Sequence, residues 1–155
     1  MTLCLWVLTA LAFTSCEQAD DIDGIFSSHG WSFSGFCYTA DWNSGRSAFL
    51  DIKLTGYEAY SQHTMTFLPG GKAEIRVPGC TFSADWEADG SERSFYIRNM
   101  KVVSGSEDHI SAFSRKFCDD LKATVWYRGD SNFIRLYGDD CKYYLLFKPL
   151  DSGIL

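Results

Sequence analysis

Residues 72–90 of the chain, KAEIRVPGCTFSADWEADG, decide its fold class. Apolar and polar side chains alternate on both sides of Pro78-Gly79, which is the pattern of two half-buried strands separated by a bend. Residues 80–88 form the most regular run, in which every second side chain is apolar. Asp89-Gly90 then predicts a tight turn into a further strand, so the stretch indicates consecutive antiparallel strands.

The same period of two recurs along most of the chain. It predicts strands at residues 31–38, 47–54, 63–68, 72–77, 80–88, 95–99, 123–128, 132–137 and 141–148. Short turns such as Pro69-Gly70-Gly71 join several of these strands and favour antiparallel pairing. We therefore expect a mainly β (α+β) domain, an antiparallel curled sheet or partly closed barrel of about eight to nine strands with one packed helix.

The helix is predicted between the strands at 95–99 and 123–128. Its apolar face recurs every three or four residues and consists of Ile110, Phe113, Phe117 and Leu121. Ser104 and Glu107 fit a capping box, so we expect the helix to begin at Ser104. The simplest interpretation of this face is a lid packed on the sheet, and the alternative is a helix that binds a partner.

Composition limits the classes of function. The chain has 155 residues, enough for one domain, and 46% of them are apolar, which suffices for a buried core. The formal net charge is −6, and four of the acidic residues, Glu17, Asp20, Asp21 and Asp23, lie together near the N-terminus. Acidic and basic residues nearly balance beyond them, and the absence of a basic field argues against nucleic-acid binding.

Residues 1–15 predict a secretory signal. Their apolar stretch, residues 3–13, is too short to span a bilayer. Small residues then precede Cys16 in the run LAFTSC, which resembles a bacterial lipobox. That resemblance implies that Cys16 becomes the first mature residue and carries the lipids that anchor the protein. The alternative is an ordinary cleaved signal followed by an unmodified cysteine.

Residues 16–29 are expected to form the lipidated Cys and an acidic tether, with a single β-rich domain at residues 30–150. The acidic run after Cys16 resembles the short signal that sends lipoproteins of Bacteroidetes to the outer face of the outer membrane. The alternative is a solvated linker whose like charges repel one another. We expect a lipid-anchored location at the outer membrane, on either the surface-exposed or the periplasmic face.

Cysteine and histidine spacings give expectations about disulfides and metals. An even number of cysteines in an exported domain predicts two disulfides, with the pairing left open, among Cys37, Cys80, Cys118 and Cys141. Neither these cysteines nor the scattered His29, His63 and His109 follow a zinc-ligand spacing, so we expect no metal and no cofactor. The three histidines are expected on the surface or in loops.

The order of elements from residue 63 to residue 148 resembles the META (HslJ-like) domain of bacterial envelope proteins. The residues that carry this resemblance are the run 77–82 (VPGCTF), the helix at 113–121 and the closing run 143–147 (YYLLF). A lipocalin-like domain is the alternative. The resemblance implies a small Bacteroidetes-type lipoprotein, and it brings no catalytic residue set with it.

The sequence contains none of the common catalytic signatures, such as G-x-S-x-G or H-E-x-x-H, so we expect a protein that is not an enzyme. Aromatic residues are abundant at 16%. Tyr96, Tyr127 and Tyr144 lie opposite the core stripes, and the candidates for binding a partner are Trp42, Tyr38, Tyr57 and Tyr60. The alternative for these rings is cross-strand pairing on a half-buried face.

The expected function is therefore that of a membrane-anchored envelope lipoprotein that binds a protein or other envelope partner. One alternative is a carbohydrate-binding lipoprotein, in which a flat ring such as Trp42 stacks on a sugar. The other is a lipocalin-like carrier of a small apolar ligand, which requires an open barrel interior.

Overall fold

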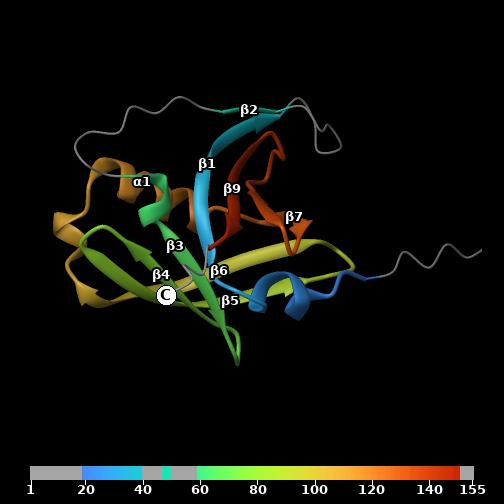
Figure 1. Cartoon of the computed structure of the whole chain (residues 1–155), viewed down its shortest axis with the longest axis horizontal. Coiled ribbons are helices and arrows are strands. Elements are labelled where there is room, and N and C mark those ends of the chain that lie inside the picture. The colour runs from blue at the N-terminus through green and yellow to red at the C-terminus, as the bar shows by residue number, and fades with distance from the viewer. Residues whose placement is uncertain (1–18, 40–46, 50–58, 151–155) are drawn as a thin grey trace, which may run out of the picture.

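The computed structural model describes residues 19–39, 47–49 and 59–150 (Figure 1). A π-helix, η1, opens this part of the chain, and two 3₁₀ turns and one α-helix interrupt its nine strands. The elements are η1 (Asp23–Ser27), β1 (Trp31–Thr39), β2 (Ser47–Phe49), η2 (Tyr60–Gln62), β3 (Thr64–Leu68), β4 (Lys72–Val77), β5 (Cys80–Asp89), β6 (Ser94–Gly105), η3 (Glu107–His109), α1 (Ala112–Lys122), β7 (Trp126–Asp130), β8 (Phe133–Tyr137) and β9 (Tyr143–Pro149).

The strands form one antiparallel sheet in the order β2-β1-β3-β4-β5-β6-β7-β8-β9, and β9 also pairs with β1. β1 pairs with β9 along one edge, from Trp31 to Tyr38, and shares its other edge between β3 and β2. The sheet therefore closes into a ring, which confirms the predicted curled, barrel-like antiparallel fold. The weakest junction lies between β6 and β7, where Ser94 and Trp126 are the paired residues.

The inside of the ring is filled by large side chains. The inward residues of the strands are joined by residues of η1 and α1, and the largest of those that are fully buried include Phe26, Trp31, Phe33, Phe36, Met65, Phe82, Phe95, Phe117, Tyr127 and Phe147. Protein cores of this kind pack as densely as organic crystals. The open interior that a lipocalin-like carrier requires is therefore not found among the described residues.

α1 closes one side of the ring, and its start differs from the prediction. The N-cap is Ser111, whose Oγ accepts a hydrogen bond from the Ser114 N–H at 2.9 Å. Ser104 lies within β6 and pairs with Thr81, so the expected start at Ser104 is wrong. Three residues of the predicted apolar face, Phe113, Phe117 and Leu121, are buried on α1, whereas Ile110 is buried before the helix begins.

The segment expected to be a tether is instead part of the folded body from Asp20 onward. η1 buries Ile25 and Phe26 (Figure 1, blue). The ring of Phe26 packs on Phe67, Phe95 and Tyr127 with centroid distances of 5.0–5.3 Å. The apolar residues that follow the acidic run drive this docking, since leaving them in water costs free energy.

This packing predicts that Phe26→Ala lowers the free energy of unfolding by about 3–5 kcal/mol, the usual cost of removing a buried phenyl ring. Urea denaturation of a soluble form that begins at Glu17 measures the effect. Ser27→Ala, at an exposed neighbouring position, is the matched control and should change stability little. Equal stability of the two variants would contradict the assignment of η1 to the core.

Candidate functional site

A hollow of about 380 Å³ lies on the outer face of the sheet over β4, β5 and β6, between Leu68 and Val103. Its polar lining comes from outward side chains of these strands, among them Lys72, Asp85 and Lys101. The hollow coincides with a bulge in β6, because two steps along β5 from Ser83 to Asp85 face three steps along β6 from Arg98 to Lys101. A bulge bends the strand that carries it, and the bend shapes the hollow.

Hydrogen bonds organise the polar side chains of this hollow, which we call the groove. Lys72 Nζ donates to Asp85 Oδ1, and Asn99 Nδ2 donates to Asp85 Oδ2 at 2.7 Å. The two hydrogen bonds, first that from Lys72, hold the pKa of the Asp85 carboxyl below its ordinary value. Both carboxylate oxygens are therefore occupied and Asp85 stays ionised. This arrangement suits the positioning of Lys72 and Asn99 for binding, and it makes Asp85 a weak general base, because a carboxylate with a lowered pKa binds protons weakly.

A second, smaller hollow of about 230 Å³ continues the groove and shares Asp85 and Asn99 with it. It is lined by Tyr96 and Arg98, whose guanidinium carbon lies 4.7 Å from the centre of the Tyr96 ring. Such a cation–π contact holds the ring and the guanidinium together at a surface. The sequence places Tyr96 opposite the buried Phe95 and Ile97, and this alternation was the signal for an outward ring.

The structure tests the position of two of the four predicted binding residues. Tyr38 on β1 is half exposed, and Tyr60 in η2 packs on Phe113 with a centroid distance of 5.2 Å. Neither residue lines the groove. Trp42 and Tyr57 lie outside the described residues.

Tyr127 and Tyr144, also noted for lying off the core stripes, are fully buried. They therefore belong to the packing of the sheet and not to a binding surface.

The state of the cysteines differs from the predicted disulfides. Cys37, Cys80, Cys118 and Cys141 are all free thiols in the structure, so the two expected disulfides are not found. Cys37 packs with Tyr137 and Tyr144, whereas Cys80 and Cys118 belong to the main core. Burial raises the pKa of the Cys118 thiol to about 12, which keeps this cysteine protonated and inert at neutral pH. Cys16 lies outside the described residues.

A buried serine–histidine pair was missed by the sequence analysis. His63 and Ser114 are both fully buried, and His63 Nε2 lies 2.9 Å from Ser114 Oγ. His63 lies in the connection between η2 and β3, in keeping with the expected surface or loop position, but it is buried and not exposed. The rings of Phe33, Phe113 and Phe117 surround the imidazole. The pair satisfies two buried polar groups between β3 and α1, and no substrate reaches it in this position.

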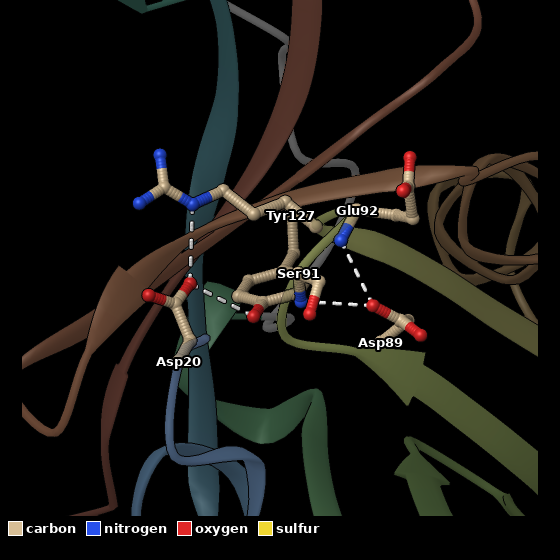
Figure 2. Close-up of polar contacts among 6 residues, drawn as sticks. Asp20, Asp89, Ser91, Glu92 and Tyr127 are labelled. Carbon is tan, nitrogen blue, oxygen red and sulfur yellow. Dashed lines mark hydrogen bonds and ion pairs between the residues drawn. The ribbon is translucent and has the colours of Figure 1, made fainter. Parts of the chain in front are cut away.

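Two carboxylates fasten peripheral segments to the sheet. Asp20 accepts hydrogen bonds from Tyr127 Oη at 2.9 Å and from Arg93 Nε at 3.2 Å (Figure 2). Asp120 on α1 accepts one from Tyr143 Oη at 2.6 Å. Figure 2 also shows Asp89 capping the β5–β6 turn, where it accepts the N–H groups of two turn residues. We call the Asp20, Arg93 and Tyr127 group the Asp20 clamp.

Within the described ranges, no group of three or more His, Cys, Asp or Glu side chains is placed to hold a metal ion. No helix in the same part of the chain is long and apolar enough to cross a membrane.

The Asp20 clamp and the hydrogen bond between Tyr143 and Asp120 predict a loss of stability at high pH. Burial, followed by the hydrogen bonds to Asp20 and Asp120, raises the pKa of Tyr127 and Tyr143 above the ordinary value of 10.0. In the unfolded chain both phenols lose their protons at about pH 10, whereas the folded protein retains them. Their contribution to stability is therefore complete below pH 10 and is lost as the pH rises above it.

We expect Tyr127→Phe to flatten this alkaline loss by up to about 1.4 kcal/mol per pH unit. Urea titrations between pH 8 and about pH 11.5 measure it, and Tyr96→Phe on the outer face is the control. An unchanged slope in Tyr127→Phe would exclude this linkage.

A solved protein structure has a similar fold. No curated protein sequence matches this chain. The crystal structure of a DUF4847 family protein from Bacteroides vulgatus ATCC 8482 is similar, with a TM-score of 0.66 and 22% sequence identity. The alignment covers 82% of this chain and 96% of that one.

These findings give no support to the META or lipocalin-like assignments, although the barrel-like fold is compatible with the resemblance. The family model described as "Domain of unknown function (DUF4847)" matches residues 17–149. The chain therefore belongs to the DUF4847 family.

Proposed function

We propose that the protein is a non-enzymatic lipoprotein, anchored to the outer membrane through Cys16, that binds an envelope partner through the outer-face groove. One observation carries this proposal. The inside of the ring is filled, while the outer face holds a hollow of about 380 Å³ whose charged side chains are already positioned by hydrogen bonds. Hollows of this size are typical of ligand sites.

The chemistry of the groove favours binding over catalysis. Lys72 and Lys101 supply positive charge, Asp85 supplies negative charge, and Asn99 supplies an amide. Leu68 and Val103 at its borders are 42% and 59% exposed. Exposed apolar side chains beside hydrogen-bonding groups offer a protein partner both kinds of contact that interfaces use. Of the two serine–histidine pairs in the described part of the chain, Ser114 and His63 are sealed in the core, and Ser28 and His29 are exposed neighbours in sequence that lie outside the groove.

Carbohydrate binding is the second candidate, and the Tyr96–Arg98 contact favours it. A sugar ring stacks on an exposed aromatic face, and neighbouring carboxylate and amide groups bind its hydroxyls. Tyr96 lies in the hollow that shares Asp85 and Asn99 with the groove, so both kinds of group are present together. Trp42, the sugar candidate from the sequence, lies outside the described residues. Tyr96 is the candidate that we propose from the structure.

Lipid anchoring predicts that Cys16→Ser abolishes the incorporation of labelled palmitate and releases the protein from membranes into the soluble fraction. Acyl chains supply about 0.8 kcal/mol per buried methylene, so their loss removes the anchor. Cys141→Ser, at a partly buried cysteine of the domain, is the control and should keep the label. Labelling that persists in Cys16→Ser would refute the anchor.

Partner binding is tested with a soluble form that starts at Glu17, which retains the Asp20 clamp. Lys101→Glu reverses a charge in the groove and should weaken binding to purified outer-membrane components at least tenfold, or about 1.4 kcal/mol. Lys142→Glu, at another exposed lysine, is the matched control. Wild-type affinity of Lys101→Glu would rule out the groove.

A glycan array separates the two candidates. Signals on the array that are lost in Tyr96→Ala, which removes the stacking face, would assign the site to carbohydrate. An array without signals, together with a protein partner that is sensitive to Lys101→Glu, would assign it to protein. Array signals that survive Tyr96→Ala would exclude this ring as the sugar platform.

A further inference from the structure

The N-terminal segment is fixed to the β5–β6 turn at Asp20. The Asp20 N–H donates to the Gly90 carbonyl oxygen at 3.1 Å, and the Asp20 carboxylate binds Arg93 and Tyr127 (Figure 2). The two backbones approach so closely that a Cβ on Gly90 would lie 2.3 Å from the Asp20 carbonyl oxygen. The chain is therefore held against this turn before it enters the core at Phe26.

The chain that precedes this fixed point is short. Residues 17–19 separate Cys16 from Asp20. Four Cα steps span at most about 14 Å when the chain is fully extended. A lipid on Cys16 would therefore keep Asp20, and the turn to which it is bound, within this distance of the membrane surface.

We infer that the end of the barrel formed by residues 89–93 and the Asp20 clamp faces the phospholipid headgroup layer, so that the anchor sets the orientation of the whole domain. This inference rests on the lipid anchor of the proposed function. A flexible acidic tether would leave the orientation free, whereas a clamped one restricts it.

The chemistry of this end indicates approach without insertion. It carries Asp21, Asp23, Asp89 and Glu92, and its one base, Arg93, is paired with Asp20. The large apolar side chains that are exposed in the described part of the chain all lie elsewhere, at Tyr38, Leu68, Val102, Val103 and Leu150. A surface without an exposed large apolar side chain has nothing to insert into the bilayer, so the anchor alone holds this end near the headgroups.

The orientation also sets the height of the groove. Lys101 pairs with Ser83, six residues before Asp89 at the end of β5. At 3.3–3.4 Å per residue, this separation is about 20 Å along the strand. Because the strands of a barrel are tilted by about 35–45° from its axis, the groove stands about 15 Å farther from the bilayer than the clamped end. A partner in the envelope can reach it there.

Energy transfer to the bilayer tests this orientation. The lipidated full chain, with Cys141→Ser to remove the partly exposed thiol, carries a donor dye at Ser91→Cys or at Lys101→Cys. It is incorporated into phosphatidylcholine vesicles that contain a headgroup-labelled acceptor lipid. The buried Cys37, Cys80 and Cys118 are shielded from the dye.

We expect transfer from position 91 to exceed transfer from position 101 at least about twofold, because position 101 lies about 15 Å farther from the bilayer. Insertion of a twelve-residue Gly-Ser linker between Gln18 and Ala19 preserves the clamp and the lipid but adds about 19 Å of mean reach. The two transfer efficiencies should then converge.

Equal transfer from the two positions in the lipidated protein without the linker would overturn the orientation and leave the anchor intact. A difference that survives the linker unchanged would also overturn it, because the short chain would then not be its cause. Absence of palmitate on Cys16 would instead refute the proposed function, and the orientation with it.

Discussion

The pairing of β1 with both ends of the sheet is the constraint on which the structure depends. β1 meets β9 along one edge and β3 along the other, so the sheet becomes a ring with a distinct inside and outside. Period-two alternation then assigns every side chain of a strand to one of these two environments. The inside is filled by buried side chains of the strands, η1 and α1, many of them aromatic.

The strands alone do not fill the core of the ring. Two peripheral segments complete this core in the same manner. η1 inserts Phe26, and α1 inserts Phe113 and Phe117 into the core. Each segment is then fastened by a carboxylate that accepts a tyrosine hydroxyl and pairs with a base, namely Asp20 with Tyr127 and Arg93, and Asp120 with Tyr143 and Lys116. Apolar burial supplies most of the stability, and the charge-assisted hydrogen bonds fix the position.

The sequence predicted the sheet well because alternation and turn residues are local signals. It placed the start of α1 at Ser104, since a capping box can occur by chance within a strand whose partner, here Thr81, is distant in sequence. It treated Asp20 as part of a tether because the partners Arg93 and Tyr127 lie far along the chain. The disulfide prediction failed for a similar reason, because an even number of cysteines does not show whether any two of them lie close enough to bond. The groove depends on a bulge in β6, which alternation cannot show.

The position of the clamp and the position of the groove have a common origin in the β5–β6 hairpin. Its turn receives Asp20, and its middle carries Asp85, Asn99 and Lys101. Two hydrogen-bonded strands therefore connect the Asp20 clamp to the groove. Under the proposed anchoring, this hairpin would direct the outer face one way and would raise the effective concentration of the groove for a partner fixed in the same membrane.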